Sequence, residues 1–474
     1  MKHLSKSTLL WAWFIGFCAW GVGLTAQASV TVTVDPKVAG SGVPADFIGL
    51  SFETEKALPN NGKYFFRAEN KPLIALFHTL GIKSLRIGGN TADRPTIKVP
   101  STSDLDSLFA FAKAAEVRVI YTLRMRDGEP KDAAELAKHI MEHYKPLLAC
   151  FAIGNEPNVF SKEYPAYREA WQKYMEAVTA AAPEARFCGP SATPGKTAWA
   201  RDFVHDFGRS GRIVFITQHD YPGGAGNKAT NVVAARDKML SPTWLDHYEQ
   251  FYQSFASEAL SNGLPYRLEE ANNFYNGGAK DVSDTFAAAL WGLDYLHWWA
   301  AHRAAGINFH TGDQVAAGEL MNSCRYATFW TSPDGYNVHP IGYGIKAFDL
   351  GSHGQAVPAT VAGSGNGNLT AYSVLAPDKG LCVTLINKEH GAVGRSAEVT
   401  INVGAPYVHG EMMLLTAPQA DVAAKSGVTL GGAAIKDDGS WTGAWSPVAA
   451  RSAPGAFTVT VPTATAAIVK LSPE

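Results

Sequence analysis

The chain has 474 residues, of which 46% are hydrophobic, 18% charged and 11% aromatic. This balance is enough to bury a large core, and it excludes an intrinsically disordered or fibrous protein. Lysine and arginine total 41 against 43 aspartates and glutamates, so the net charge of −2 does not point to nucleic acid or an anionic membrane as a partner.

The first 28 residues have the pattern of a secretory signal peptide. Lys2 and Lys6 form a positively charged start, an apolar run follows over Leu9–Leu24, and Ala26-Gln27-Ala28 supplies the small residues of a cleavage site. The alternative is a membrane anchor, but this run is short for a span of about 20 residues. We expect a secreted or periplasmic protein, cut near Ala28, with no membrane span in the mature chain.

Residues 45–350 alternate short apolar runs with longer amphipathic stretches. Runs that are apolar on both faces are typical of parallel strands covered by helices. Eight strand–helix pairs predict a (β/α)8 TIM barrel, and the alternative of a doubly wound sheet lacks a glycine-rich turn after the first strand. The eight predicted strands are residues 46–53, 84–88, 117–124, 148–156, 185–191, 213–221, 266–270 and 306–311.

The residue pattern changes after the predicted barrel. Residues 351–474 contain short β-rich runs separated by Gly, Pro, Asn and Asp, which predict an antiparallel β-sandwich domain. Residues 29–44 include the alternating strand Ser29–Val34, which we expect to join that late sheet.

Cysteine usage and motif content exclude several kinds of site. Four cysteines in the expected mature chain are too few for a disulfide framework and contain no CxxC pair for zinc. His219 and Asp220 suggest a metal only weakly, because no third ligand is apparent. There is no phosphate-binding loop and no Gly-x-Ser-x-Gly motif. We expect neither a metal nor another cofactor.

Two carboxylates stand out at the ends of predicted strands. Glu156 ends the fourth strand and Glu270 ends the seventh, so a barrel brings both to the same mouth. A retaining glycosidase needs two carboxyl groups about 5–5.5 Å apart, one to protonate the leaving oxygen and one to attack the sugar. Either residue could instead cap a helix or pair with an arginine, and barrels host many chemistries.

Four motifs carry a resemblance to a known family. Asn155-Glu156-Pro157 resembles the acid/base motif of the retaining glycosidases built on eight-fold barrels. Residues 268–279 (LEEANNFYNGGA), followed by 283–288 (SDTFAA), resemble the nucleophile segment of glycoside hydrolase family 79, the β-glucuronidase and heparanase family. Residues 85–90 (LRIGGN) and 218–221 (QHDY) resemble the same family at the second and sixth strands.

The resemblance implies a role for each matching residue. Glu156 would be the general acid/base and Glu270 the nucleophile. Glu269 is the rival of Glu270, but strand alternation should send only one of the two into the mouth, and the register with Tyr275 favours Glu270. Asn155 would hold the sugar 2-hydroxyl.

Two further residues of the sixth strand enter through the same resemblance. Tyr221, two residues after His219, would donate a hydrogen bond to the nucleophile and keep it ionised. The alternative is that both belong to an ordinary packed strand end.

The resemblance also implies a pocket for a sugar carboxylate, built largely from tyrosine hydroxyls and backbone amides. Tyr275 matches one such position well. Tyr326 is the candidate for the second, although Cys324 or Arg325 stands where the family favours glycine, and Arg325 could supply a charge-assisted contact. Tyr343 is a weaker alternative that could pack between barrel and sandwich.

Three more polar residues end predicted strands. Ser51 and Glu53 lie at the end of the first strand, and Asn90 follows the second. They could either reach sugar hydroxyls or lie as solvated strand ends.

The sequence therefore predicts a retaining exo-β-glucuronidase that releases terminal β-D-glucuronic acid, with or without a 4-O-methyl group. Its partner would be an oligosaccharide or glycoside that contains glucuronic acid. One alternative is an endo-acting, heparanase-like enzyme. The anionic polymer that such an enzyme cuts would favour basic clusters beside the cleft, and this chain contains no Lys/Arg run. The other is a carbohydrate-binding protein without catalysis.

Overall fold

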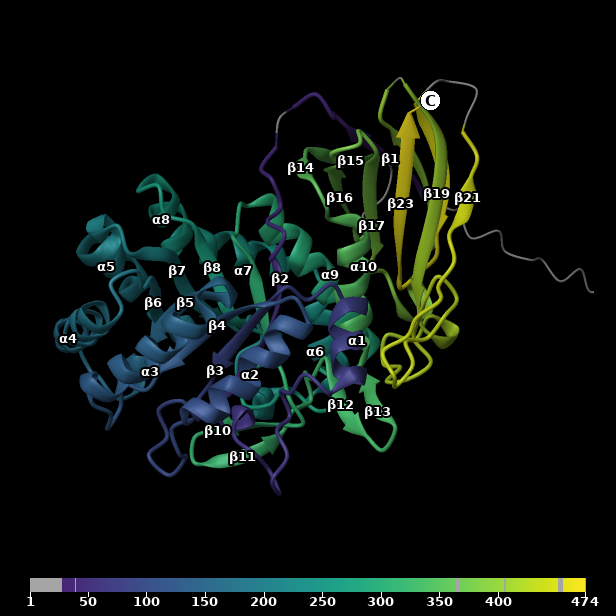
Figure 1. Ribbon diagram of the computed structural model, residues 1–474. Coiled ribbons are helices and arrows are strands. Elements are labelled where there is room, and N and C mark those ends of the chain that lie inside the picture. The colour runs from purple at the N-terminus through teal and green to yellow at the C-terminus, as the bar shows by residue number, and fades with distance from the viewer. Residues whose placement is uncertain (1–27, 39, 364–366, 405, 451–454, 474) are drawn as a thin grey trace, which may run out of the picture.

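Eight parallel strands close into a barrel, which confirms the predicted TIM fold (Figure 1). The computed structural model describes residues 28–38, 40–363, 367–404, 406–450 and 455–473, so residues 1–27 of the predicted signal peptide lie outside the described residues. Each strand overlaps one of the eight predicted runs. In chain order the strands are β2 (Ile48–Glu53), β3 (Ser84–Gly88), β4 (Arg118–Leu123), β5 (Leu148–Ile153), β6 (Phe187–Ala192), β7 (Ile213–Asp220), β8 (Tyr266–Ala271) and β9 (Ile307–His310).

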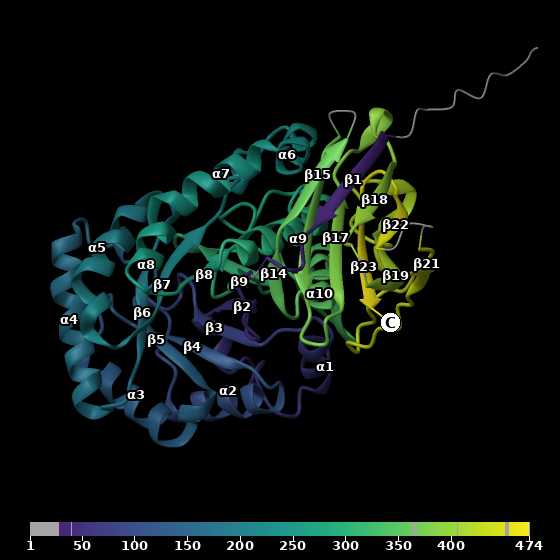
Figure 2. The same cartoon turned by 90° about the horizontal axis from the view of Figure 1, so that it is seen from above.

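Helices cover the outside of the barrel (Figure 2). Strands β2, β5, β6 and β8 are buried at every position, because helices cover one face and side chains fill the barrel on the other. The helices are α1 (Lys71–Thr79), α2 (Thr102–Ala114), α3 (Pro130–Tyr144), α4 (Tyr164–Ala181), α5 (Thr197–Phe207), α6 (Val232–Met239), α7 (Thr243–Phe251), α8 (Ser257–Ser261), α9 (Phe286–Ala301) and α10 (Pro340–Gly351).

Two small hairpins follow the last barrel strand. One pairs β10 (Gln314–Ala317) with β11 (Leu320–Ser323), and the other pairs β12 (Phe329–Ser332) with β13 (Gly335–Val338). Both extend from the carboxyl end of β9, so they add walls at the end of the barrel where the strand carboxyl termini lie (Figure 1).

The C-terminal region forms two packed sheets, which confirms the predicted β-sandwich. The larger sheet has the order β14-β16-β17-β23-β19-β20, with β21 paired to β19, and the smaller has the order β15-β1-β18-β22. Apolar side chains of both sheets share one core. The strands are β14 (Gln355–Val357), β15 (Ala359–Gly363), β16 (Leu369–Leu375), β17 (Leu381–Asn387), β18 (Ala397–Asn402), β19 (Tyr407–Thr416), β20 (Thr429–Leu430), β21 (Ser446–Val448), β22 (Ala456–Val461) and β23 (Thr465–Pro473).

The strand that precedes the barrel lies inside the smaller sheet of the sandwich. β1 (Ala28–Val34) runs antiparallel to β15 and parallel to β18 (Figure 2). Val30, Val32 and Val34 are buried in the sandwich core. The chain thus starts in the sandwich, builds the barrel, and returns.

Helices α9 and α10 lie between barrel and sandwich (Figure 1). Every residue of α9 except its last is buried, because the barrel covers one side and the sandwich the other. Tyr343 of α10 belongs to this junction, where its hydroxyl accepts a hydrogen bond from the backbone N–H of Ile435 (3.0 Å). Tyr343 thus packs between barrel and sandwich, which was the sequence-based alternative to a place in the carboxylate pocket.

None of the four cysteines in the described part of the chain forms a disulfide. Cys150, Cys188, Cys324 and Cys382 all carry free thiols, and the first three are buried. No helix in the described part of the chain has both the length and the apolar character that crossing a bilayer requires.

Candidate active site

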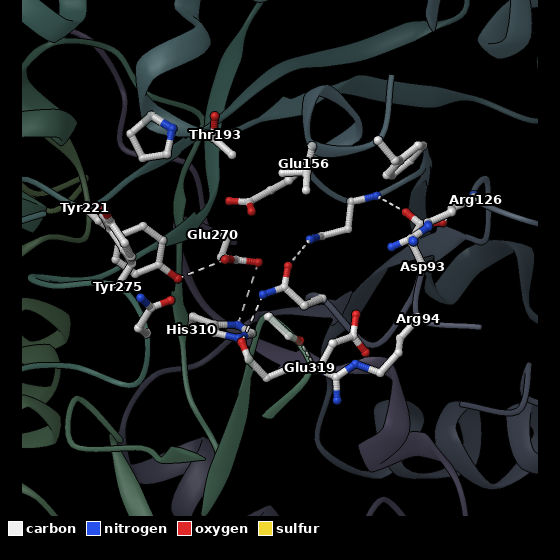
Figure 3. Close-up of a pocket in the computed structure, with 18 of the residues that line it drawn as sticks. Asp93, Arg94, Arg126, Glu156, Thr193, Tyr221, Glu270, Tyr275, His310 and Glu319 are labelled. Atoms are coloured by element: carbon white, nitrogen blue, oxygen red, sulfur yellow. Dashed lines mark hydrogen bonds and ion pairs between the residues drawn. The ribbon is translucent and has the colours of Figure 1, made fainter. Parts of the chain in front are cut away.

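A cavity of about 530 Å³ opens at the carboxyl ends of the barrel strands (Figure 3). Active sites of TIM barrels lie at this face, because loops that follow the strands build it. Most of the residues singled out in the sequence line the cavity. They are Asn90, Asn155, Glu156, Tyr221, Glu270, Tyr275 and Tyr326.

Glu156 and Glu270 face each other across this cavity. One carboxylate oxygen of each, together with a ring nitrogen of His219, lie within 4.8 Å of one another. The imidazole Nδ1 of His219 is 3.0 Å from Glu156 Oε1 and 3.7 Å from Glu270 Oε1. His219 is fully buried and lies beneath the cavity rather than in its lining. His219 therefore contacts the two carboxylates but does not line the cavity.

Positive charge and hydrogen bonds surround Glu270. Arg86 Nη1 donates to Glu270 Oε2 at 2.6 Å, and the Tyr221 hydroxyl donates to Oε1 at 2.9 Å. Burial alone would raise the pKa of Glu270, but the charges of His310, His219 and Arg86 and the Tyr221 hydroxyl outweigh it and hold this pKa well below its usual range. Glu270 is consequently an ionised carboxylate.

Burial has the opposite effect on the hydroxyl that supports Glu270. The pKa of Tyr221 is raised well above its usual value by burial and by the negative charge of Glu270. Tyr221 therefore keeps its proton and remains a hydrogen-bond donor.

Glu269 lies deeper in the barrel than Glu270, and both point inward. Ser191 Oγ donates a short hydrogen bond to Glu269, and His219 Nε2 lies 3.9 Å from it. The same imidazole thus contacts both glutamates. Only Glu270 lines the cavity, as expected, but both glutamates contact His219, because β8 is irregular against both of its neighbours around these residues. A bulge of this kind re-aims side chains near active sites.

Glu156 has an unusual backbone conformation. Its φ of 45° and ψ of 51° are left-handed, which is uncommon for a residue other than glycine. The turn that holds it is closed by hydrogen bonds from the Glu156 N–H to Ser191 O and from the Val159 N–H to Glu156 O, both 2.9 Å. Conformations of this kind occur where the surrounding structure imposes them, often at functional sites. Here the turn directs the carboxylate into the cavity (Figure 3).

Asn155 is held by side chains of β3 and of the loop that follows it. Its side-chain oxygen accepts from Arg86 Nη2 (2.7 Å), its side-chain nitrogen donates to Asn90 (3.3 Å), and its backbone N–H donates to Asp93 (2.6 Å). Arg86 therefore contacts both Asn155 and Glu270, so a single guanidinium sets the relative position of two cavity residues.

Ser51 and Glu53 are buried and do not line the cavity. Glu53 accepts from the backbone N–H and the hydroxyl of Thr91 (2.8 and 2.7 Å), and it lies 3.5 Å from His310 Nε2. Ser51 Oγ is 3.1 Å from His310 Nδ1 and also accepts from Arg86. In this structure both residues contact neighbouring side chains below the floor of the cavity.

His310 lies in the cavity lining with carboxylates on two sides. Its Nδ1 is 3.9 Å from Glu270, and its Nε2 faces Glu53. Burial alone would lower the pKa of His310, but Glu270 and Glu53 raise it above its usual value. His310 therefore adds positive charge beside Glu270.

Three tyrosines form one end of the cavity. The ring of Tyr221 lies 6.1 Å, between centroids, from the rings of both Tyr275 and Tyr326. Tyr326 is buried, whereas 40% of Tyr275 is exposed. Figure 3 shows Tyr221 and Tyr275 on the side of Glu270 away from Arg126. This end offers hydroxyl groups beside the two carboxylates.

Sequence reasoning missed three residues of the site, namely Arg86, His310 and Asp93. Arg86 lies inside the LRIGGN motif, and a charged residue within an otherwise apolar buried strand is a signal that could have found it. His310 is a polar residue at the end of β9. That position indicated a place at the mouth of the barrel, but it did not indicate which residues His310 contacts. Asp93 lies in the loop between β3 and α2, where no sequence pattern indicates a role for it.

A family model of glycosyl hydrolase family 79, N-terminal domain, matches residues 156–297. The matched region starts at Glu156 and includes Tyr221 and Glu270. The resemblance to family 79 is confirmed. The match covers the part of the barrel from just after β5 into α9.

Curated relatives agree with family 79 over part of their length. A β-glucuronidase of Aspergillus niger is 26% identical over 189 residues, which are 35% of this chain and 34% of that protein. A heparanase of Rattus norvegicus is 27% identical over 213 residues, 41% of this chain and 38% of that protein. The chain thus covers little more than a third of the length of the curated relatives it matches.

Solved structures match over nearly the whole chain at low identity. A 4-O-α-L-rhamnosyl-β-D-glucuronidase from Fusarium oxysporum 12S has a TM-score of 0.71 at 18% identity, covering 93% of this chain and 99% of that one. An arabinofuranosidase of family 51 from Xanthomonas axonopodis pv. citri has a TM-score of 0.70 at 14% identity, covering 94% and 100%. These similarities show a shared fold of barrel and sandwich.

Proposed function

We propose that this protein is a retaining exo-β-glucuronidase. The observation that carries the proposal is the pair Glu156 and Glu270, whose carboxylate oxygens lie within 4.8 Å of each other in one cavity. Carboxylates this close suit direct attack by one of them, whereas an inverting enzyme needs about 6.5–9.5 Å between its carboxyl groups to admit a water. The similarity to family 79 supports the same chemistry.

In the first step Glu270 attacks the anomeric carbon while Glu156 gives its proton to the leaving oxygen. The glycosidic bond breaks, the alcohol leaves, and a covalent glycosyl ester forms on Glu270. In the second step Glu156 takes a proton from water, the water attacks the same carbon, and Glu270 is released. Arg86, His310 and Tyr221 stabilise the Glu270 carboxylate at the start and the end of this cycle.

The tyrosine end of the cavity supports an acidic sugar as substrate. Tyr275 and Tyr326 line it, and hydroxyl groups can donate to a carboxylate there. His310, whose pKa is raised, lies beside this end, with its ring 6.2 Å from that of Tyr326 between centroids. Names of similar proteins, a β-glucuronidase among the relatives and a glucuronidase among the solved structures, agree with this choice.

We also propose that the chain is exported, on the pattern of residues 1–28 alone. N-terminal sequencing of the protein recovered outside the cytoplasm should begin near Ser29. A mature chain that still begins at Met1 would contradict this.

The first test compares hydrolysis of a chromogenic β-D-glucuronide with the matching glucoside and galactoside. We expect cleavage of the glucuronide alone and a loss of at least about 10³-fold in kcat for Glu270→Gln, because the nucleophile is absent. Glu269→Gln is the matched control, since this neighbour does not line the cavity, and it should keep most of the activity.

Other outcomes separate the alternatives. Hydrolysis of the neutral sugars would retain the glycosidase and reject the acid pocket. Cleavage of an internal bond in a glucuronic-acid polymer, without action on the chromogenic glucuronide, would favour an endo-acting, heparanase-like enzyme. Thermal protection by glucuronic acid with no turnover of any substrate would indicate a carbohydrate-binding protein.

The acid/base role of Glu156 has its own readout. With an activated aryl glucuronide, Glu156→Ala should regain turnover in azide and give the β-glucuronosyl azide, because a small anion can attack the glycosyl intermediate where the base is missing. The product keeps the anomeric configuration of the substrate. An α-configured azide product, or no effect of azide, would reject the assignment.

A further inference from the structure

The wall of the cavity on the Glu156 side carries three apolar side chains, of which Val159 is exposed and the other two are half-buried. Val159 and Phe160 follow Glu156 in the short turn after β5, Pro194 lies in the loop after β6, and all three line the cavity. We name these three residues the apolar shelf. Seven large hydrophobic side chains are exposed in the described part of the chain, and Val159, at 67%, is one of only two among them that line this cavity.

The position of the shelf decides which part of a substrate it meets. The proton donor of a glycosidase must reach the oxygen of the leaving group, so the aglycone lies on the side of Glu156. The Val159 N–H bonds to the carbonyl of Glu156 itself, so the shelf is tied directly to the proton donor. Given the proposed function, the group next to the glycosidic oxygen must therefore lie against these residues.

Hydrogen bonds join the two loops of the shelf in the absence of a ligand. Asn158 Nδ2 donates to Thr193 Oγ1 (2.9 Å), and the Thr193 N–H donates back to Asn158 Oδ1 (3.0 Å). This reciprocal pair joins the turn that carries Val159 to the loop that carries Pro194. A preformed apolar surface loses little conformational entropy on binding.

Arg94 and Arg126 also line the cavity but offer less to a ligand. Arg94 already donates to the carbonyl of Gly318 and approaches Met321 Sδ (3.6 Å). Arg126 is exposed and lies 3.8 Å from its neighbour Asp127, so water screens any contact it makes with an anion. Covering Val159, by contrast, removes apolar surface from water.

We propose that the shelf is an aglycone site for apolar groups, so that the preferred substrates are glucuronides of hydrophobic alcohols or phenols rather than glucuronosyl saccharides. The inference rests on the proposed function and names the substrate class within it. An apolar ring lies on the shelf while the sugar occupies the tyrosine end.

The test uses three glucuronides, with ethyl, cyclohexylmethyl and galactosyl groups as the aglycone. Ethyl and cyclohexylmethyl alcohols are both primary, so their leaving abilities are similar and a difference in kcat/KM reports binding of the ring. We expect kcat/KM for the cyclohexylmethyl glycoside to exceed that of the ethyl glycoside about tenfold, mainly through KM, and to exceed that of the disaccharide.

Variants assign the effect to the shelf. Val159→Ser should reduce the cyclohexylmethyl-to-ethyl ratio about three- to fivefold. Val233→Ser is the matched control, because Val233 is an exposed valine of α6 that does not line this cavity, and it should leave the ratio at the wild-type value. Melting temperatures of both variants show that they are folded.

Two results would overturn the inference. Equal kcat/KM values for the ethyl and cyclohexylmethyl glycosides, or faster cleavage of the disaccharide, would reject the apolar site and leave the proposed function intact. If no glucuronide of any kind, the chromogenic one included, is cleaved, the proposed function and the inference fall together.

Discussion

At Glu270, burial and charge act on the pKa in opposite directions. A carboxylate this buried would ordinarily be protonated more easily, yet Arg86, His219, His310 and Tyr221 together keep it ionised. The nucleophile of a retaining glycosidase has to be ionised, so this environment suits the role proposed for Glu270. Each of these groups lowers the pKa of Glu270, so the loss of one of them should raise this pKa.

We predict that Tyr221→Phe shifts the acidic limb of the kcat/KM profile to higher pH by about 1 unit. Removing a donor to an ionised carboxylate raises the pKa of Glu270, and activity is lost where Glu270 becomes protonated. The matched control is Tyr295→Phe, which removes a donor to Asp220 (2.7 Å) outside the cavity. An acidic limb that stays in place in Tyr221→Phe would mean that this hydroxyl does not support the nucleophile.

Among the elements, β1 joins the start of the described chain to a sheet built from its last third. Val32 is fully buried between Val361 of β15 and Ile401 of β18, whereas Thr33 next to it is exposed. Alternation thus separates a core face from a solvent face within one short strand. The core face of β1 is part of the sandwich, so the sandwich is incomplete without it.

We predict that Val32→Asp lowers the free energy of unfolding by at least about 3 kcal/mol, because it places an unpaired charge in the sandwich core. Thr33→Asp, the same change one residue along, should cost less than about 1 kcal/mol. Equilibrium unfolding in urea measures both. Similar losses in the two variants would show that β1 does not hold the register described here.

In the whole molecule, barrel and sandwich meet through a buried ion pair. Asp294 of α9 lies 3.0 Å from Lys388, which follows β17, and both side chains are at most 5% exposed. The hydroxyls of Thr370 and Tyr372 of β16 also donate to Asp294 (2.7 and 2.8 Å). One carboxylate of the barrel therefore satisfies three donors of the sandwich.

We predict that Asp294→Ala lowers the free energy of unfolding by about 3–5 kcal/mol, because Lys388 is left buried without a partner. Asp237→Ala is the matched control. Asp237 of α6 pairs with His390 (2.9 Å) across the same junction, but its side chain is 55% exposed, so we expect a loss below about 1 kcal/mol. Equal effects would show that the buried pair contributes no more than the exposed one.

Much of the fold could be read from the sequence because its signals are local. Eight apolar runs predicted the eight barrel strands, since a parallel strand covered on both faces must be apolar along its length. β3 coincides with its predicted run, residues 84–88, at both ends. The two glutamates were found for a similar reason, because polar residues at the ends of such runs share one face of a barrel.

The contacts of the site depended on the tertiary structure. Arg86 and Glu270 are 184 residues apart in the chain, and only closure of the barrel brings their side chains to 2.6 Å. The contact of both Glu269 and Glu270 with His219 comes from an irregularity of β8 against both neighbouring strands, which simple alternation does not predict. Ser51 and Glu53 end a strand at the mouth, yet His310 and other partners from distant strands bury them below the cavity floor.

The sequence by itself determined the eight barrel strands, the β-rich C-terminal region and the two carboxylates at the strand ends, because spacing and polarity along the chain encode which face is buried. The tertiary structure alone decided which cations surround Glu270 and where Val159 is exposed. Those properties depend on distances between residues far apart in the chain, and such distances exist only once the barrel has closed.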